Sequence, residues 1–236
     1  MRYGWKRDRP DHRDYKLGAP APGLPAPPTW DLTPHMPPIW DQGKTSSCTA
    51  HATAAALQHA ANRITPPSRM FIYYTTRVIE GDVDKDDGAE IRDAVKAVSS
   101  LGACDESVWP FDTENLFQKP NRWAYNNAAT LANYARTYLR VTQTVDALRS
   151  AISSGYPVIF GFNVPRSFES NAVAQSGIMP MPGPNDYTPE GHAVLAVGYE
   201  SDYFIIRNRW GDSRGKHGYF RMPRDFISDP SCASDF

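Results

Sequence analysis

WDQGKTSSCTAHATAAALQHAAN, residues 40–62, indicates a polar loop that leads directly into a helix. The residues before Cys48 include the turn-forming Gly43, whereas those after it are small or helix-favouring and contain neither Pro nor Gly. Cys48 is therefore expected at or near the N-terminus of a helix. Free backbone N–H groups and the helix dipole favour a thiolate there and lower the pKa of the thiol. The same pattern fits a small apolar residue in a core, so a nucleophile needs support from elsewhere in the chain.

Length and composition indicate a folded chain that recognises its partners by shape. The 236 residues are 41% apolar with a formal net charge of −1, which excludes a strong electrostatic attraction to nucleic acid or to a membrane surface. No apolar run approaches the roughly 20 residues that span a bilayer, and the first residues lack the apolar stretch of a signal peptide. We expect a soluble monomer, with the cellular compartment left open.

The three cysteines are Cys48, Cys104 and Cys232, and they cannot all pair within one chain. Three cysteines are also too few for a disulfide scaffold. We expect Cys104 and Cys232 to be buried thiols, with a bridge between them as the alternative in an exported protein.

Residues 1–28 differ from the rest of the chain, because a charged opening is followed by a Pro-rich run over 20–28. Such a segment is extended, and it is either a flexible leader or a segment docked on the folded body. Apolar side chains that are costly to leave in water favour docking, namely Tyr3, Trp5, Tyr15 and Leu17.

Helical patterns come first and strand patterns later, which indicates an α+β architecture. We expect one domain over residues 29–236. Its helical lobe covers about 42–140, and its β lobe covers about 141–225 together with the first residues of the domain. A cleft between the lobes would hold the site. The expected helices follow Cys48 and cover 68–79, 90–101 and 145–153, with 122–138 as helix or loop, and the expected strands cover 157–162, 192–199 and 203–207.

Two patterns allow a metal-site reading, and neither is preferred. Residues 81–88 are rich in Asp, but they lack the terminal Glu of a calcium-binding loop, so a solvated acidic loop is expected. Cys48 and His51 have the spacing of half a zinc site, but no second pair accompanies them. No metal and no cofactor are expected.

Three further residues supply what a thiol nucleophile requires. His192 begins a strand after Gly191 and is a candidate base, and Asn208 follows a strand 16 residues later and can hold the imidazole ring. Trp210 can shield that hydrogen bond from water. Gln42, on the loop before Cys48, can donate to a developing oxyanion.

These segments also carry a family resemblance. Gln42-Gly43 before Ser47-Cys48, Gly191-His192-Ala193-Val194, and Asn208-Arg209-Trp210-Gly211 followed by Gly218-Tyr219 resemble the papain-like cysteine peptidases over roughly 30–222. The resemblance implies the papain-like two-lobed fold, a helical lobe against an antiparallel β lobe with the active-site cleft between them. It also implies the roles of nucleophile for Cys48, general base and acid for His192, orienting group for Asn208 and oxyanion donor for Gln42.

The sequence departs from the family pattern near the nucleophile. Thr45 stands where a disulfide-forming Cys is usual, and Thr49 stands where Trp is usual. Gly88 matches one glycine of the segment where family members bind the substrate backbone, and Gly191 and Trp210 are further candidate substrate-binding residues. These departures and the short opening are closer to bacterial members of the family.

We therefore expect a cysteine endopeptidase that acts on a peptide or protein substrate through a Cys48 thioester. An acyltransferase or deamidase with the same triad, and a catalytically silent papain-like binding module, are the alternatives. A further hypothesis is that residues 1–28 lie in the cleft and restrain activity.

Overall fold

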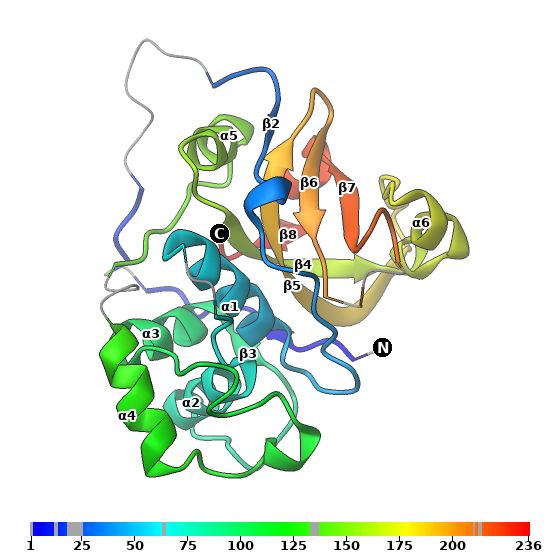
Figure 1. Ribbon diagram of the computed structural model, residues 1–236. Coiled ribbons are helices and arrows are strands. Elements are labelled where there is room, and N and C mark those ends of the chain that lie inside the picture. Colours follow the sequence, from blue (N-terminus) through cyan, green and yellow to red (C-terminus); the bar gives the residue numbers. More distant parts are fainter. Residues whose placement is uncertain are drawn as a thin grey trace.

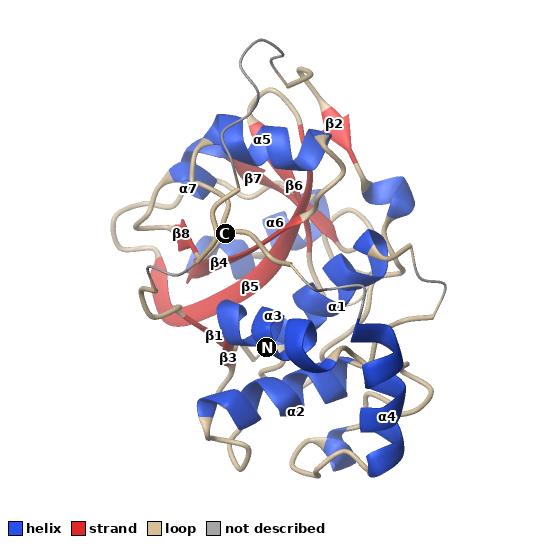
Figure 2. Cartoon of the chain, turned by 90° about the vertical axis from the view of Figure 1, so that its left-hand side faces the viewer, coloured by secondary structure: helices blue, strands red, loops and turns tan. Residues whose placement is uncertain are grey.

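The computed structural model describes residues 2–11, 14–17, 26–62, 65–132, 137–209, 211 and 214–236. It confirms the α+β class, because a bundle of helices packs against a mostly antiparallel sheet (Figures 1 and 2). Each part has its own apolar core, and a third, small cluster lies around Cys48.

The central helix α1 (Cys48–Ala60) contributes to both cores. Its small side chains are buried nearly all round, as expected for a helix enclosed by protein. Ala50, Ala54 and Leu57 pack into the core of the helical part, whereas Ala55 packs into the core beneath the sheet. Figure 1 shows α1 between the sheet and the other helices.

Three more helices complete the helical part, α2 (Arg69–Glu80), α3 (Ile91–Leu101) and α4 (Arg122–Leu131). The Ser68 hydroxyl accepts from the backbone N–H of Phe71 and caps the start of α2. Gly81 ends this helix in the left-handed conformation, with φ of 78°. The 3₁₀ turn η2 (Thr113–Asn115) lies between α3 and α4.

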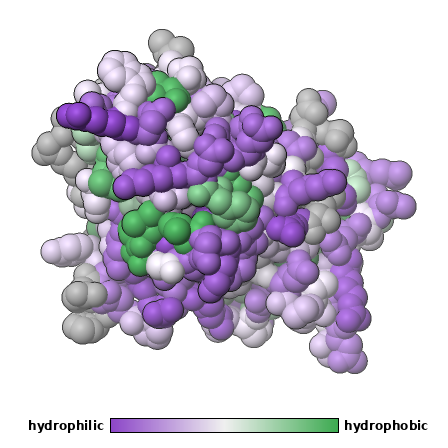
Figure 3. Space-filling view, turned by 90° about the horizontal axis from the view of Figure 1, so that it is seen from below, coloured by the Kyte–Doolittle hydropathy of each residue, from purple (hydrophilic) through white to green (hydrophobic). Residues whose placement is uncertain are grey.

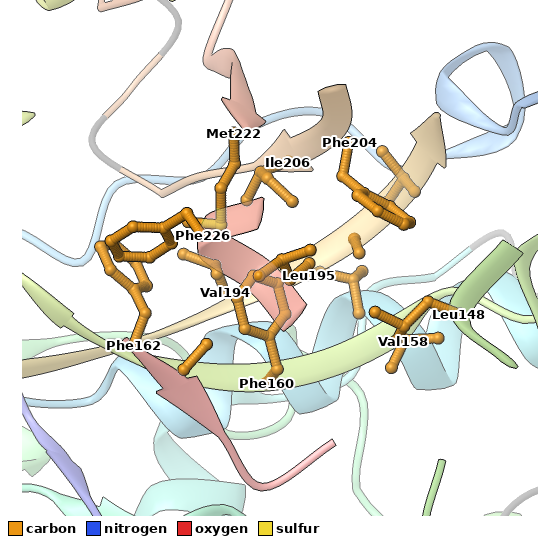
Figure 4. Close-up of a cluster of buried hydrophobic side chains, with 14 of the residues drawn as sticks. Leu148, Val158, Phe160, Phe162, Val194, Leu195, Phe204, Ile206, Met222 and Phe226 are labelled. Carbon is orange, nitrogen blue, oxygen red and sulfur yellow. The ribbon is translucent and has the colours of Figure 1, made fainter. Parts of the chain in front are cut away.

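The main sheet has the strand order β7-β6-β5-β4-β8 and its neighbours are antiparallel. The strands are β4 (Val158–Pro165), β5 (Tyr187–Tyr199), β6 (Tyr203–Arg207), β7 (Tyr219–Pro223) and β8 (Ala233–Ser234), and β2 (Trp30–Asp31) pairs with β5. Aromatic and aliphatic side chains from both faces of β4, β5 and β6 fill its core (Figure 4). His192 lies near the middle of β5, two residues before the stretch Val194–Val197 that packs into this core.

Short helices surround the sheet. They are α5 (Val145–Ser153), α6 (Asn171–Ser176) and α7 (Arg224–Ser228), with 3₁₀ turns η1 (Thr33–His35) and η4 (Arg166–Glu169). Leu148 and Ile152 of α5 are buried against the sheet, as the period of its apolar residues requires.

Most of the expected elements are present, and the differences lie at their ends. Strands β4 and β5 are longer than expected, because polar residues such as Asn163 and Thr188 extend the pairing beyond the apolar runs. The uncertain segment 122–138 forms α4 as far as Leu131, and 133–136 lie outside the described residues. The short strand β7 was not expected, because its sequence YFRMP lacks a continuous apolar run.

The described part of the N-terminal segment lies against the body. Trp5 and Lys6 form β1, which pairs in parallel with β3 (Ala89–Glu90). Trp5 is buried, and Tyr3 and Leu17 pack against the core of the sheet. The expectation was wrong for Tyr15, whose side chain is 76% exposed. Residues 18–25 lie outside the described residues.

The acidic loop is solvated in part, because Asp84 is exposed and the Asp87 side chain is 55% exposed, whereas the Asp86 side chain is only 7% exposed. Asp86 accepts from the backbone N–H of Ser46 at 2.9 Å and from the Tyr73 hydroxyl at 2.8 Å. Lys6 forms ion pairs with Asp82 at 2.7 Å and Asp87 at 2.8 Å. Lys6 of the distant N-terminal segment therefore pairs with carboxylates for which the sequence shows no nearby partner.

An apolar patch lies on the face shown in Figure 3, within a mostly hydrophilic surface. Helix α2 exposes Val78 by 52% and Ile79 by 46%. A cavity of about 840 Å³ is lined by Tyr74, Val78, Gly81, Val83, Lys119, Pro120, Arg122 and Tyr125. These lining residues include no cysteine or histidine, so this cavity is not the candidate active site.

In the described ranges, none of the helices has the length and apolar character needed to cross a membrane.

Candidate active site

Cys48 is the first residue of α1, as the sequence predicts, and its side chain is completely buried. The preceding loop is held by hydrogen bonds from Thr45, whose hydroxyl donates to the Gln42 carbonyl at 2.9 Å and lies 2.6 Å from the Ser47 hydroxyl. These contacts constrain the loop at the position where family members usually have a disulfide. The first helical hydrogen bond runs from His51 N–H to the Ser47 carbonyl at 3.1 Å.

His192 lies on β5 and is also completely buried. Its Nε2 is 3.0 Å from the side-chain oxygen Oδ1 of Asn208, which follows β6. Because an amide oxygen only accepts, Nε2 carries the proton of this hydrogen bond. In the neutral ring the other nitrogen, Nδ1, is then the basic one.

Strand β5 also brings a backbone donor to the thiol. The backbone N–H of Ala193, the residue after His192, interacts with the Cys48 thiol and lowers its pKa, as do the N–H groups of Thr49 and Gly4. Cys48 and Ala193 belong to the same small apolar cluster. The structure therefore brings the nucleophile candidate and the strand of the base candidate together.

The ionisation of this pair differs from the expectation. Burial raises the pKa of the Cys48 thiol above its ordinary value, and it outweighs the lowering by the Arg209 charge and by the three N–H groups. Burial also holds the pKa of His192 well below its ordinary value, and the Arg209 charge lowers it further. The expectation of a lowered thiol pKa was wrong for this state, because the N-terminal segment covers the helix end that would otherwise be hydrated.

Gln42 lies under the same segment. Its side-chain Nε2 donates to the Arg2 carbonyl oxygen at 3.0 Å and to the Thr45 carbonyl oxygen at 2.7 Å. Its backbone N–H donates to the Arg209 carbonyl oxygen at 3.1 Å, which fixes the loop to the residue after Asn208. The amide is therefore positioned to donate to carbonyl oxygens, and both of those that it binds belong to the chain itself, one of them in the N-terminal segment.

The candidate substrate-binding glycines both contact the N-terminal segment. A Cβ atom on Gly88 would lie 2.1 Å from the Gly4 carbonyl oxygen, and Gly88 has a φ of 96°. A Cβ atom on Gly191 would lie 2.4 Å from a ring atom of Trp5. Both positions therefore require glycine for close approach of an extended chain. Trp210, the third candidate, lies outside the described residues.

Arg209 is a residue of the site that sequence reasoning did not assign. It is 4% exposed, and its Nη1 donates to the backbone carbonyl oxygen of Cys48. Burial lowers the pKa of Arg209 to about 10, which leaves the guanidinium charged at neutral pH. Its position directly after Asn208 was the only available signal.

The remaining cysteines and histidines that the structure describes are not grouped into a metal site. Cys104 and Cys232 are free and buried in the cores of the helical part and of the sheet, which confirms the expectation of buried thiols. The Nδ1 of His51 lies 3.0 Å from the Ser47 carbonyl oxygen. Across the described residues, no three His, Cys, Asp or Glu side chains are grouped so that they could hold a metal ion.

A cysteine at the start of a central helix, facing a strand that carries an amide-held histidine in an α+β fold, is the arrangement of thiol peptidases. A sequence model described as papain family cysteine protease matches residues 26–234. The chain belongs to the papain family.

Known proteins support this membership. The chain is 41% identical over 210 residues to an uncharacterised peptidase C1-like protein of Acanthamoeba polyphaga mimivirus, with 83% of this chain and 67% of that protein covered. It is 26% identical to mouse cathepsin J, with 90% and 64% covered. The chain thus spans about two thirds of the length of these relatives.

Solved structures agree with the fold. Xylellain, a cysteine protease from Xylella fastidiosa, superimposes with a TM-score of 0.90 at 38% identity, with 99% of this chain and 93% of that chain covered. Digestive procathepsin L 3 of Tenebrio molitor shares the fold, with a TM-score of 0.72 at 19% identity over 94% of this chain and 73% of that chain.

Proposed function

We propose that the protein is a cysteine endopeptidase that hydrolyses peptide bonds through a thioester on Cys48. The hydrogen bond between His192 and Asn208, on the strand whose Ala193 N–H interacts with the Cys48 thiol, is the observation that carries the proposal. It holds the imidazole with Nδ1 as its basic nitrogen, which can take the thiol proton.

In the acylation step, the Cys48 sulfur attacks the peptide carbonyl carbon and the carbonyl oxygen becomes an oxyanion. Gln42 Nε2 donates to this oxygen, as it donates to the Arg2 carbonyl in the structure. The His192 imidazolium then gives its proton to the leaving amine, and a thioester remains. In deacylation, His192 removes a proton from water and the hydroxide adds to the thioester carbon. The C–S bond then breaks, the acid product leaves, and the His192 imidazolium shares its proton with the Cys48 sulfur, which restores the starting pair.

The experiment compares Cys48→Ala with the parent chain on a peptide substrate, with product masses as the readout. We expect no hydrolysis by the variant and an unchanged melting temperature to within a few degrees, since only the sulfur is removed. Products heavier by one water molecule in total indicate hydrolysis, whereas products joined to an added amine indicate acyl transfer. Parent-rate hydrolysis by Cys48→Ala would contradict the proposal.

We further propose that residues 1–28 are a leader that restrains a peptidase domain comprising residues 29–236. Several contacts support this proposal: the Arg2 carbonyl accepts from Gln42 at 3.0 Å, the Gly4 N–H interacts with the Cys48 thiol, and the Tyr3 ring packs edge-on against His192 at 5.2 Å. A substrate carbonyl cannot reach Gln42 while Arg2 occupies it.

Backbone pairing and charge add to the strength of the docking. The Ala89 N–H donates to the Gly4 carbonyl at 2.8 Å, and a side chain on Gly4 would collide with the Ser46 carbonyl. Asp8 and Asp14 form ion pairs with Arg140, and Asp14 also pairs with Arg92. The leader therefore competes with the substrate for the active-site cleft.

Deletion of residues 1–28 tests the restraint. We expect a large gain in peptidase activity, and addition of a peptide with the sequence of residues 2–17 should inhibit the shortened chain competitively. Unchanged rates from a folded deletion variant, judged by its circular dichroism and melting transition, would contradict the restraint while leaving the peptidase assignment intact.

A further inference from the structure

A chain of buried hydroxyl groups leads from the loop of Gln42 to a histidine of α1. The Thr45 hydroxyl lies 2.9 Å from the Gln42 carbonyl oxygen and 2.6 Å from the Ser47 hydroxyl. The Ser47 hydroxyl oxygen is in turn 3.2 Å from Nδ1 of His51. All four of these residues are at most 2% exposed, so water does not compete for these hydrogen bonds.

The direction of each hydrogen bond follows from the Gln42 end of the chain. A carbonyl oxygen only accepts, so the Thr45 hydroxyl proton goes to Gln42. The Thr45 oxygen therefore accepts the Ser47 proton, and the Ser47 oxygen accepts from the Nδ1–H of His51. The Ser47 carbonyl oxygen, 3.0 Å from the same nitrogen, requires a proton there as well. His51 is thus held in one tautomer, with its proton on Nδ1.

The surroundings of His51 keep its ring neutral. Burial holds its pKa well below the ordinary value, and the charges of Arg69, Arg209 and Arg207 lower it further. Arg69 comes from α2 and pairs with Glu106 at 2.6 Å, whereas the other two come from the end of β6 and the segment after it. A neutral ring that is protonated on Nδ1 presents a bare acceptor at Nε2.

A small cavity lies beside this ring. Its volume is about 10 Å³, which is room for one water molecule, and its lining includes His51 and Arg209. Each of these two residues has one buried polar atom without a hydrogen-bond partner among the described residues, Nε2 of His51 and Nη2 of Arg209. The first is an acceptor and the second a donor. One water molecule that accepts from Arg209 and donates to His51 satisfies both.

The other end of the chain fixes the proposed oxyanion donor. Thr45 contacts Gln42 at two points, because its hydroxyl donates to the Gln42 carbonyl and its own carbonyl accepts from Gln42 Nε2 at 2.7 Å. A shift of Thr45 would therefore move the amide N–H that has to point at the substrate oxygen.

We propose that His51 is a positioning residue for the oxyanion donor Gln42. It acts through the hydroxyls of Ser47 and Thr45, and one buried water molecule connects its far side to Arg209. The inference rests on the proposed peptidase function, because it assigns His51 a part in stabilising the oxyanion. It also gives the loop a hydrogen-bonded brace in the place where the family usually has a disulfide.

The first test needs no peptidase activity. NMR of the full-length chain with nitrogen-labelled histidines reports the protonation of each ring nitrogen, and the signals absent from His51→Asn belong to His51. We expect a neutral ring with Nδ1–H at neutral pH. An imidazolium, or a ring with its proton on Nε2, would overturn the proposal.

The second test separates positioning from stability with two matched pairs of variants in the full-length Trp5→Ala chain, in which the leader is weakened. Thr45→Val keeps the shape but removes the hydroxyl, so kcat should fall about tenfold with little change in KM, because the oxyanion forms only in the transition state. Thr45→Ser keeps the hydroxyl and should restore most of the rate. His51→Leu should behave like Thr45→Val, whereas His51→Asn offers an amide N–H near the position of Nδ1 and should retain more activity. Parent kcat in both Thr45→Val and His51→Leu would overturn the proposal.

A double-mutant cycle with Gln42→Ala identifies the group on which the chain acts. Once the Gln42 amide is gone, Thr45→Val should lower kcat much less than it does in the presence of Gln42. Fully additive losses would show that Thr45 and His51 act only on folding, and melting temperatures of the same variants measure that contribution. Parent-rate hydrolysis by Cys48→Ala would contradict the proposed function instead, whereas the tautomer measured by NMR supports or overturns the hydrogen-bond chain in either case.

Discussion

The guanidinium of Arg209 donates to the backbone carbonyl oxygen of Cys48 and places a buried positive charge beside the nucleophile. This charge lowers the pKa of Cys48 and also lowers the pKa of His192, although burial has the larger effect on both groups. Arg209 therefore favours a thiolate and disfavours an imidazolium at the same site. Its effect on catalysis is a shift of the pH range in which both charged forms coexist.

Arg209→Met, which keeps the length and removes the charge, should raise both pKa values. Without the guanidinium, the thiolate forms at higher pH and the imidazolium persists to higher pH, so both limbs of the kcat/KM profile move upward. The measurement is kcat/KM against pH for the chain without residues 1–28. Arg209→Lys is the matched control and should keep the parent profile more closely. An unchanged profile in Arg209→Met would show that the Arg209 charge does not shift the pKa values of Cys48 and His192, and that Arg209 acts only through its hydrogen bond to the Cys48 carbonyl.

The leader should also control the reactivity of the Cys48 thiol. Burial raises the Cys48 pKa in the full-length chain above its ordinary value, which disfavours the thiolate at neutral pH. Iodoacetamide should therefore label Cys48 slowly at neutral pH and faster only as the pH rises through the raised pKa. Without residues 1–28, labelling should be rapid at neutral pH.

Peptide mass mapping measures this labelling rate residue by residue. Cys104 is the internal control, because it is free and buried in the core of the helical part. Cys232 does not serve, because Arg7 of the leader donates to Ser234 and to the Pro230 carbonyl on either side of it. Equal Cys48 rates with and without the leader would contradict the shielding.

Ion pairs between the leader and the body predict a second route to activation. Asp14 is partly desolvated, which raises its pKa, but hydrogen bonds from Arg92 and Arg140 outweigh this effect and hold the pKa below its ordinary value. A lowered carboxyl pKa stabilises docking above the ordinary value of about 3.9 and loses that contribution as the pH falls through the docked pKa. Strong acid should therefore loosen the leader.

Asp14→Asn mimics the protonated state at neutral pH, so it should raise the activity of the full-length chain about tenfold or more. Arg140→Met should do the same, since Arg140 pairs with both Asp8 and Asp14. Arg9→Ala is the control: the Arg9 side chain is 91% exposed, so its ion pair with Glu90 contributes little and its loss should have no more than a small effect. Steady-state peptidase rates distinguish these outcomes, and equal rates in all three variants would rule out the ionic anchor.

The architecture and the candidate residues could be predicted from the sequence because they depend on local signals. The polar loop before an uninterrupted helix located Cys48, and apolar runs located the strand that carries His192 and the strand that ends directly before Asn208. The packing of Arg209 against Cys48 could not be predicted, since nothing local marks a buried arginine 161 residues away.

Long-range partners also explain the remaining errors. In the sequence, the acidic residues 82–87 resemble a solvated loop, because the cations that pair with them, Arg2 and Lys6, lie far away in the N-terminal segment. The lowered pKa expected for Cys48 came from the helix N-terminus alone. The burial that raises this pKa includes packing against Trp5 of the N-terminal segment, which depends on how the chain folds back. Aromatic residues in the leader indicated docking, but only the fold distinguishes buried Trp5 from exposed Tyr15.

The hydrogen bond from His192 to Asn208 gives the last prediction, which separates ring orientation from charge. Asn208→Ala removes the acceptor that holds Nε2–H, so kcat/KM should fall about tenfold or more while the substrate still binds. Asn208→Asp keeps an acceptor and adds a negative charge, which should raise the His192 pKa and move the basic limb of the pH profile upward. Measurements of kcat/KM against pH on chains without residues 1–28 distinguish the two variants. A shifted basic limb in Asn208→Asp with a near-parent maximum would show that Asn208 acts by orienting the ring, whereas parent activity in Asn208→Ala would show that the strand alone holds His192.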